Sequence, residues 1–334
     1  MIYPDFIKKN DLIGITAPSD GISGELEINR LNNAITKLKN YGFQIKETDN
    51  VRTSFEGRSA DGKIRANEFM SLITDSNVKH IICATGGDYL CEILPYIDEN
   101  KIKNNPKWIQ GYSDIGTLTY LITTKLDIAT SYSYTIKPYG MEPWDKSLNN
   151  SLELLEEKRN TVKSSNLYEN KYKKYETGLE SFNLDTKNEW ITLNKSESKG
   201  RIIGGCLESI LNLFKEGYDY TGKFINKYIS DGFIWYFDVF EGNNESLIYD
   251  LNIFKEKGYF ENIKALILGK RFIGEDYSQE TFKNSLLKLF ENEDIMIVLE
   301  ADISHKGPLM TVINGSIAEV KVKDGKGTIK YSFE

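Results

Sequence analysis

The sequence contains only two histidines and three cysteines among its 334 residues. With so few histidines, a zinc site built on imidazole ligands is nearly excluded, and no two cysteines have the spacing of a zinc-binding pair. A small, odd number of cysteines is typical of a reducing compartment, where thiols stay free. We therefore expect a cytoplasmic protein without a metal centre.

Long apolar runs and an excess of positive charge are also missing. No apolar segment approaches the ~20 residues that a membrane-spanning helix needs, and the first residues do not resemble a signal peptide. The formal net charge is −7, which argues against a nucleic-acid-binding surface. Neither a G-x-G-x-x-G motif nor a P-loop is present, so binding of dinucleotides or nucleoside triphosphates has little support. We expect no nucleic-acid partner and no membrane association.

The first half of the chain alternates short apolar segments with amphipathic ones. Predicted strands lie at residues 12–16, 43–47, 78–84, 108–110 and 128–131, and predicted helices at 24–41, 60–75, 88–97, 115–125 and 147–158. This order predicts a parallel sheet covered by helices on both faces, as in Rossmann- or flavodoxin-like α/β domains. In such sheets the working site lies beyond the carboxyl ends of the strands.

The second half of the chain has a different pattern. Residues 159–199 are rich in polar residues and tyrosine without a sustained period, which is typical of a connecting segment. Further strands and helices follow, and residues 309–333 alternate apolar and polar side chains around an Asp-Gly turn, which predicts antiparallel strands. We therefore predict an N-terminal α/β domain (1–158) and a smaller C-terminal α/β domain (200–334) with antiparallel closing strands.

Ser113 is the candidate nucleophile. The predicted strand before it breaks at Gly111, and a helix begins at about Ile115. A serine on such a strand-to-helix turn projects from the sheet edge beside the unpaired amides of the helix. Serine is also a favoured helix N-cap, so a purely structural role is the alternative. The second glycine, Gly116, comes one residue later than in the G-x-S-x-G motif.

A serine hydroxyl needs a base to remove its proton, and only two imidazoles are available. His80 starts a predicted buried strand, which is the wrong end for an active site, and we expect a surface or edge histidine there. His305 follows the predicted strand at residues 295–299 and is the candidate base, although a loop histidine is often only solvated. The N-terminal domain then carries the nucleophile and the C-terminal domain the base.

Asp238 is the candidate acid that orients the imidazole. It lies near the end of the apolar run at residues 233–239, where a charge is costly unless it is paired. A structural hydrogen bond or a cap to the next loop is the alternative. Glu241 and Asp302 are fallback partners for His305.

Backbone amides near the candidate nucleophile can stabilise an oxyanion. Gly86 and Gly87 follow the predicted strand at residues 78–84, and their bare backbone either approaches a ligand or forms a tight turn. The amide of Asp114 begins the helix after Ser113. Ser19 follows the first strand and either lines a pocket or merely turns the chain.

Together these segments resemble the LD-carboxypeptidase family of serine peptidases (the S66 type), which includes muramoyltetrapeptide carboxypeptidases and microcin C self-immunity proteins. The resemblance covers nearly the whole chain. Its most specific part is the stretch Asn105-Pro106-Lys107 through Gly111-Tyr112-Ser113-Asp114. Individually weaker matches are residues 13–19, Arg65-Ala66, Gly86-Gly87, Gly204-Gly205 and His305.

The resemblance implies a Ser–Glu–His triad in which Ser113 matches the nucleophile and His305 the base. Asp238 takes the place of the family's glutamate, because it stands 20 residues before Gly258 (258 − 238 = 20). Its side chain is shorter by one C–C bond, about 1.5 Å. The family also usually has a Gly-Pro pair after the fifth strand, where this chain reads Ser-Tyr-Ser-Tyr at residues 131–134. The second departure concerns the shape of the substrate pocket.

The family implies hydrolysis of an L,D peptide bond in a murein tetrapeptide, with release of the terminal D-alanine, without a cofactor and often as a homodimer. The expected partner is therefore a small peptide or muropeptide. A microcin-immunity type of hydrolysis, of a peptidyl- or aminoacyl-nucleotide conjugate, is the nearest alternative, and a peptide-binding homologue with weakened catalysis is another. Residues expected to contact the substrate are Ser19, Gly205, Trp190 as an aromatic wall, and one basic residue among Arg201, Lys137, Arg271 and Lys306.

Overall fold

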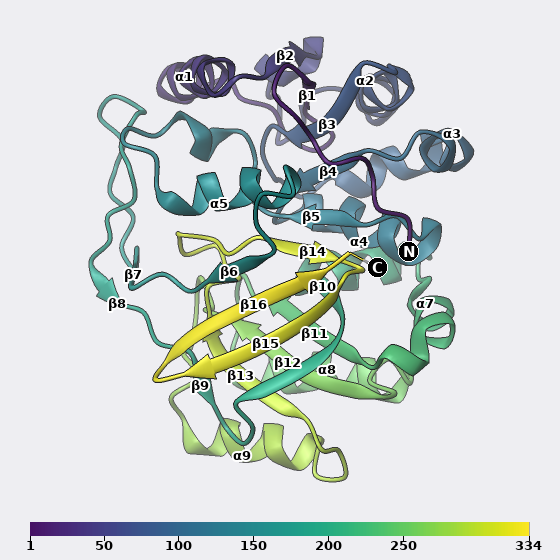
Figure 1. Cartoon of the computed structure of the whole chain (residues 1–334), viewed down its shortest axis with the longest axis vertical. Coiled ribbons are helices and arrows are strands. Elements are labelled where there is room, and N and C mark those ends of the chain that lie inside the picture. Colours follow the sequence, from purple (N-terminus) through teal and green to yellow (C-terminus); the bar gives the residue numbers. More distant parts are fainter. Residues whose placement is uncertain (334) are drawn as a thin grey trace.

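Two sheets organise the computed structural model, which describes residues 1–333 (Figure 1). The first sheet is largely parallel, and the second combines parallel strands with antiparallel closing strands. The predicted α/β fold class is therefore confirmed. The ring of Tyr3 packs against that of Phe333, with centroids 5.7 Å apart, so the two ends of the described chain meet.

The first sheet has the strand order β14-β5-β4-β3-β1-β2. Its strands are β1 (Leu12–Thr16), β2 (Gln44–Glu47), β3 (Val78–Cys83), β4 (Trp108–Gly111), β5 (Thr130–Tyr132) and β14 (Val312–Asn314). The first five are parallel and follow the 2-1-3-4-5 order of flavodoxin-like sheets. Their carboxyl ends therefore meet at one edge of the sheet, where the candidate nucleophile and the glycine pair were expected.

The strand β14 comes from the C-terminal half and pairs antiparallel with β5. The sequence pattern predicted antiparallel strands and a hairpin over residues 309–333. The strands are antiparallel, but only β15 and β16 form the hairpin, and β14 lies outside it. All three residues of β14 are buried, so they complete the first sheet instead of joining the hairpin. The two halves of the chain thus share one sheet next to the candidate site.

Helices and short 3₁₀ helices flank the first sheet. They are α1 (Glu25–Tyr41), η1 (Asp49–Arg52), α2 (Gly62–Thr74), η2 (Leu90–Tyr96), α3 (Glu99–Asn104), α4 (Ile115–Leu126), η3 (Lys137–Gly140) and α5 (Lys146–Leu155). The predicted helix at residues 88–97 is the 3₁₀ helix η2, which contains Pro95 and cannot form regular i→i−4 hydrogen bonds there. Helix α4 is buried on nearly all sides, because it packs between the first sheet and elements of the second half.

The second sheet has the order β6-β16-β15-β10-β11-β12-β13-β9. Its strands are β6 (Thr161–Lys163), β9 (Ile191–Thr192), β10 (Glu197–Cys206), β11 (Phe233–Asp238), β12 (Ile263–Gly269), β13 (Met296–Ala301), β15 (Ile317–Lys323) and β16 (Lys326–Ser332). The helices of this half are α6 (Leu207–Lys215), α7 (Thr221–Tyr228), η4 (Ile229–Asp231), α8 (Asn244–Glu256) and α9 (Glu280–Leu289). Asp324 and Gly325, both with positive φ, turn β15 into β16, as an Asp-Gly hairpin requires.

The segment expected to connect the domains contributes directly to the second sheet. It supplies β6, which pairs with β16, and β9, which pairs with β13. Between them lies a small hairpin of β7 (Leu167–Tyr168) and β8 (Thr186–Lys187). The chain between these two strands extends from the C-terminal half towards α1 (Figure 1).

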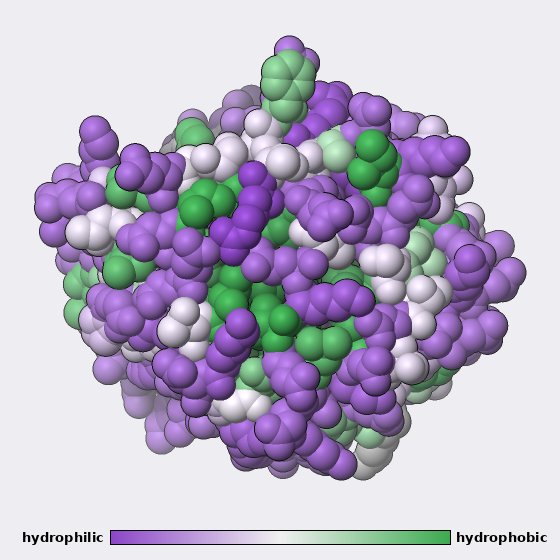
Figure 2. All heavy atoms as spheres, turned by 90° about the horizontal axis from the view of Figure 1, so that it is seen from above, coloured by the Kyte–Doolittle hydropathy of each residue, from purple (hydrophilic) through white to green (hydrophobic). Residues whose placement is uncertain are grey.

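The surface seen in Figure 2 is covered mostly by hydrophilic side chains, with apolar ones gathered near its centre. Such a distribution is ordinary, since apolar atoms contribute to every folded protein surface. No helix within residues 1–333 combines the length and the apolar character that crossing a bilayer requires.

Candidate active site

Ser113 lies on a tight turn between β4 and α4. Its φ is +63°, in the left-handed region that non-glycine residues seldom adopt. A Cβ on Gly111 would lie 2.6 Å from the Ile115 side chain, so the residue before this turn must lack one. The local sequence therefore favours a sharp strand-to-helix turn that holds a partly exposed serine at the sheet edge.

The loop after β3 packs directly against this turn. A Cβ on Gly86 would lie 2.9 Å from Ser113 Cβ, 3.0 Å from its Oγ and 3.6 Å from the amide nitrogen of Asp114. Glycine at this position thus lets bare backbone approach both the hydroxyl and the first amides of α4. Backbone amides and a helix N-terminus beside a serine are the arrangement that stabilises an oxyanion.

The side chain of Asp114 holds the surrounding loops together. It is buried, and its Oδ2 accepts hydrogen bonds from the Ser19 hydroxyl (2.5 Å) and from the Leu90 amide (2.9 Å). Burial raises the pKa of Asp114 above its ordinary value. The loops after β1, β3 and β4 are therefore connected through the carboxyl group of Asp114. Its backbone amide is not used in these contacts and lies at the start of α4.

Gly86→Ala provides a test of this close approach. The added methyl group must displace the Ser113 side chain, and a misplacement of about 1 Å at a reacting group costs on the order of 10²-fold in rate. We expect a loss of that size in kcat/KM, measured on whichever substrate the wild type hydrolyses, with a folded protein by thermal unfolding. Gly222→Ala is the control, because its nearest neighbour would be 3.7 Å from the new Cβ. Equal rates for the two variants would contradict the contact.

Asp238 and His305 come from the carboxyl ends of the second sheet. Asp238 ends β11 and is fully buried, and His305 lies in the loop after β13. The distance from His305 Nδ1 to Asp238 Oδ1 is 3.0 Å. The other carboxylate oxygen, Oδ2, accepts a hydrogen bond of 2.7 Å from the Tyr132 hydroxyl. The structure therefore brings the predicted acid and base into direct contact.

The imidazole of His305 is held in an aromatic setting. Its centroid is 4.8 Å from that of Phe240 and 5.1 Å from that of Tyr112. Although burial opposes it, the neighbouring Asp238 carboxylate raises the pKa of His305 above its ordinary value. Nε2, the nitrogen opposite Asp238, is buried and has no hydrogen-bond partner in the described chain. It remains able to accept a proton.

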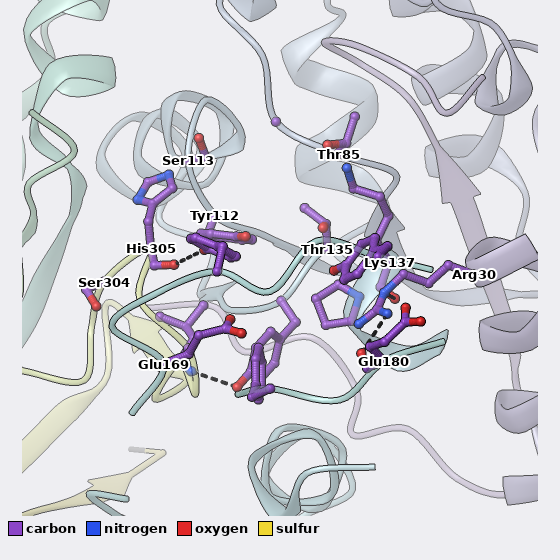
Figure 3. A pocket seen from close by; sticks show the side chains of 18 of the residues that line it. Arg30, Thr85, Tyr112, Ser113, Thr135, Lys137, Glu169, Glu180, Ser304 and His305 are labelled. Atoms are coloured by element: carbon purple, nitrogen blue, oxygen red, sulfur yellow. Dashed lines mark hydrogen bonds between the residues drawn. The ribbon is translucent and has the colours of Figure 1, made fainter. Parts of the chain in front are cut away.

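Ser113 and His305 line one pocket with a volume of about 380 Å³ (Figure 3). Such a volume lies within the usual range for small-molecule sites. The remaining walls come from strand-end loops of both sheets, from α1 and η3, and from a loop at residues 169–182, called here the covering loop. Its side chains in the pocket are Glu169, Tyr172, Lys173, Tyr175, Glu180, Ser181 and Phe182.

The covering loop is attached to both halves of the molecule. Arg30 of α1 donates hydrogen bonds to the carbonyl oxygens of Gly178 (2.8 Å) and Glu180 (2.9 Å). On the other side, the Tyr172 hydroxyl donates to the carbonyl oxygen of His305 (2.7 Å). Sequence reasoning noted the aromatic residues of this region but assigned only Trp190 to the site. Arg30 gave no signal in the sequence, because its partners lie about 150 residues away in the chain.

Four residues predicted to contact the substrate do not line this pocket, and these predictions are corrected here. Ser19 is fully buried behind the wall and binds Asp114. Gly205 lies inside β10, and Arg201 pairs with Asp231. The indole of Trp190 is buried and donates to Asp302 Oδ1 at 3.0 Å. Each serves packing or a structural hydrogen bond.

Among the other basic candidates, Lys137 lines the pocket and pairs with Glu27 at 2.9 Å. Arg271 donates to Asn244 and is buried, and Lys306 donates to Asn170. Of the four basic residues proposed from the sequence, only Lys137 therefore lines the pocket.

Three further expectations change with the structure. His80 is not a surface or edge residue: β3 is a central strand, the side chain is fully buried, and burial lowers its pKa to about 3. Glu241 is exposed, and its backbone amide donates a hydrogen bond to the Glu208 carboxylate. Asp302 is buried beside Lys270, with 3.3 Å between Nζ and Oδ1. Neither fallback acid is the partner of the His305 imidazole.

Comparison with known proteins adds two family matches. The model of the LD-carboxypeptidase N-terminal domain matches residues 13–133, and that of the C-terminal domain matches residues 199–320. A putative carboxypeptidase of Vibrio cholerae is 28% identical over 318 residues, covering 93% of this chain and 92% of that protein. The microcin C7 self-immunity protein MccF of Escherichia coli is 24% identical over 298 residues, covering 85% and 83% respectively.

Solved structures show the same fold. The microcin C7 self-immunity protein MccF in complex with aspartyl sulfamoyl adenosine aligns with a TM-score of 0.82 at 20% identity, covering 100% of this chain and 99% of that one. An MccF-like protein from Streptococcus pneumoniae in complex with AMP aligns with a TM-score of 0.78 at 24% identity, covering 97% and 99%.

Proposed function

The chain belongs to the LD-carboxypeptidase family, and we propose that it is a serine hydrolase with Ser113 as nucleophile, His305 as base and Asp238 as the orienting acid. The observation that carries this proposal is the hydrogen bond from His305 to the buried Asp238, with Nε2 left free in a pocket that Ser113 also lines. An acid that fixes one nitrogen of an imidazole leaves the other to exchange protons with a nucleophile.

The proposed reaction follows the order of an acyl-enzyme mechanism. Ser113 Oγ attacks the carbonyl carbon while its proton moves to His305 Nε2. The amides of Asp114 and of Gly86 or Gly87 stabilise the negative oxygen of the tetrahedral intermediate, at about 3 kcal/mol per donor. The intermediate collapses as the leaving amine takes the proton from Nε2. Water then releases the acyl group by the same steps, and Ser113 is regenerated.

For the substrate we propose a murein tetrapeptide, cleaved at an L,D peptide bond with release of D-alanine. The description of the matching family models supports this choice. Lys137 and Lys173 in the pocket wall supply positive charge for a substrate carboxylate.

A second candidate is hydrolysis of an aminoacyl- or peptidyl-nucleotide conjugate. It is favoured by three aromatic side chains of the covering loop, Tyr172, Tyr175 and Phe182, which line the pocket. Aromatic faces stack on nucleobases without strong base preference. The MccF structures with aspartyl sulfamoyl adenosine and with AMP support this candidate.

A direct comparison of two substrates tests the proposal. The purified protein is given a muramyl tetrapeptide and an aspartyl sulfamoyl adenosine conjugate in parallel, with Ser113→Ala as the control. We expect release of D-alanine with a higher kcat/KM than cleavage of the conjugate. The reverse order supports the second candidate, and no Ser113-dependent turnover of either compound contradicts the hydrolase proposal.

The pH dependence follows from His305. The base must be neutral to take the serine proton, and the Asp238 carboxylate raises the pKa of His305 above 6.5. We therefore expect kcat/KM to fall as the pH drops through this raised pKa, with the midpoint of the acid limb above 6.5. A pH–rate profile measures it. A profile that stays flat from about pH 8 to pH 5 would contradict the role of His305.

A further inference from the structure

Tyr132, at the end of β5, joins the acid to the turn that carries the nucleophile. Its hydroxyl donates a hydrogen bond of 2.7 Å to Asp238 Oδ2 and accepts one of 3.3 Å from the Ser113 amide. The side chain is fully buried. A phenol has a single proton, so donation to the carboxylate leaves its lone pairs for the amide. One hydroxyl thus contacts the elements of both sheets that carry the site.

Both oxygens of the Asp238 carboxylate are therefore occupied. Oδ1 contacts His305 Nδ1 at 3.0 Å, and Oδ2 accepts from Tyr132. A buried charge is stabilised when each of its acceptor sites has a partner, and the two contacts together set the plane of the carboxylate. The plane of the carboxylate in turn decides how well it directs the imidazole.

Two glycines make room for this tyrosine. A Cβ on Gly116 would lie 3.2 Å from Cε2 of the Tyr132 ring, and a Cβ on Gly205 would lie 3.7 Å from the same atom. Gly116 is the glycine that comes one residue late for the G-x-S-x-G motif, and Gly205 belongs to the glycine pair near the end of β10. The ring also packs edge-to-face against Tyr236, with centroids 5.6 Å apart. The phenol is therefore held in place from α4, β10 and β11.

We propose that Tyr132 is a positioning residue that fixes the short Asp238 carboxylate and the Ser113 turn relative to each other. This inference rests on the proposed hydrolase function. It assigns a task to the last residue of β5, next to the place where the family usually has a Gly-Pro pair. An aspartate ending β11 orients His305 because the phenol holds its second oxygen.

A test of Tyr132 must leave the other groups around Asp238 and His305 in place. Cys206, Glu208 and Tyr236 face Tyr132 or Asp238, and Tyr112 and Tyr172 lie beside His305. Glu208 also accepts from the amides of Phe240 and Glu241, which hold the loop after β11. A variant that removes only the phenol oxygen leaves all of these groups in place.

Tyr132→Phe tests the inference, with Tyr236→Phe as the matched control. Tyr236 is equally buried and donates to Asn314 at 3.0 Å, but it touches none of the three proposed catalytic residues through its hydroxyl. We expect kcat/KM to fall about 10- to 100-fold in Tyr132→Phe, the effect of losing a hydrogen bond to a charged group, and to change less than about 3-fold in the control.

A second readout does not depend on turnover. Without the phenol, the negative charge of Asp238 is compensated only by His305, so the pKa of His305 should rise further in Tyr132→Phe and stay unchanged in Tyr236→Phe. The titration is followed by NMR, which is simplified because the chain has only one other histidine. Thermal unfolding of both variants measures the loss of stability.

The outcomes distinguish failure of the proposed hydrolase function from failure of the role proposed for Tyr132. If the wild type hydrolyses neither substrate, the proposed function fails, and the His305 titration alone tests Tyr132. If the wild type is active but Tyr132→Phe keeps both its kcat/KM and its His305 pKa, the inference is overturned. Equal losses of activity and stability in the two variants, with no change in the pKa, would also overturn it, since Tyr132 would then be only structural.

Discussion

Replacing Ser113 with alanine should lower kcat/KM by about 10⁴-fold or more while the protein stays folded. The fold should persist because no hydrogen bond of the Ser113 hydroxyl is recorded in the described chain, and alanine meets the same backbone conformation at φ +63°. Release of D-alanine and thermal unfolding, measured on the same preparation, check both parts of this expectation.

Ser131→Ala is the control for that variant. Ser131 lies in the middle of β5, where its buried hydroxyl has no hydrogen-bond partner in the described chain and, unlike that of Ser113, does not line the pocket. Its removal should therefore leave kcat/KM within about 3-fold of the wild type. If Ser113→Ala were as active as Ser131→Ala, the nucleophile would have to be sought elsewhere.

The second large effect is expected from Asp238→Asn. The amide keeps the size of the side chain but cannot stabilise the imidazolium, and it favours the wrong tautomer of His305, so kcat should fall by about 10⁴-fold. The pKa of His305 should fall as well, because the neighbouring negative charge that raises it is lost. The rate and the His305 titration are both measured.

Glu241→Gln makes the same acid-to-amide change three residues away. Glu241 is exposed, and only its backbone amide is recorded in a hydrogen bond. We expect wild-type kcat and an unchanged His305 titration for this variant. Loss of activity in Glu241→Gln together with full activity in Asp238→Asn would reverse the assignment of the acid.

Where the sequence located the proposed catalytic residues correctly in the fold, it did so from local patterns. A strand, a glycine and a serine before a helix specify the turn at Ser113, and a lone charge at the end of an apolar run identifies Asp238. Parallel strands bring their carboxyl ends to one edge of a sheet, so Ser113 and Gly86 meet at the edge of the first sheet, and Asp238 and His305 at the edge of the second. The fold class followed from the same alternation of strands and helices.

The parts that failed depend on contacts between distant segments. His80 looked like an edge residue because the sequence does not say that β1 and β4 flank its strand on both sides. Ser19 was placed on the pocket wall because its bond to Asp114 spans 95 residues. Trp190 was expected to face the pocket. Its indole instead lies in the core, because the adjacent strand β9 pairs with β13 and the indole nitrogen donates to Asp302.

Tyr132 shows most clearly which contacts the sequence alone does not predict. The sequence marked its surroundings as a departure from the family pattern, yet its two partners lie 106 and 19 residues away in the chain. No local pattern states that a phenol fills the space beside a shorter acid. Only the arrangement of both sheets makes that contact visible.

Labelling with a fluorophosphonate probe, followed by mass spectrometry of the modified peptide, tests the central claim most directly. The account predicts a single modified residue, Ser113, in the wild type, and a labelling rate that falls by at least about 10²-fold in His305→Ala because the base is gone. Modification of a different serine, or a rate at Ser113 that does not depend on His305, would contradict the proposed triad.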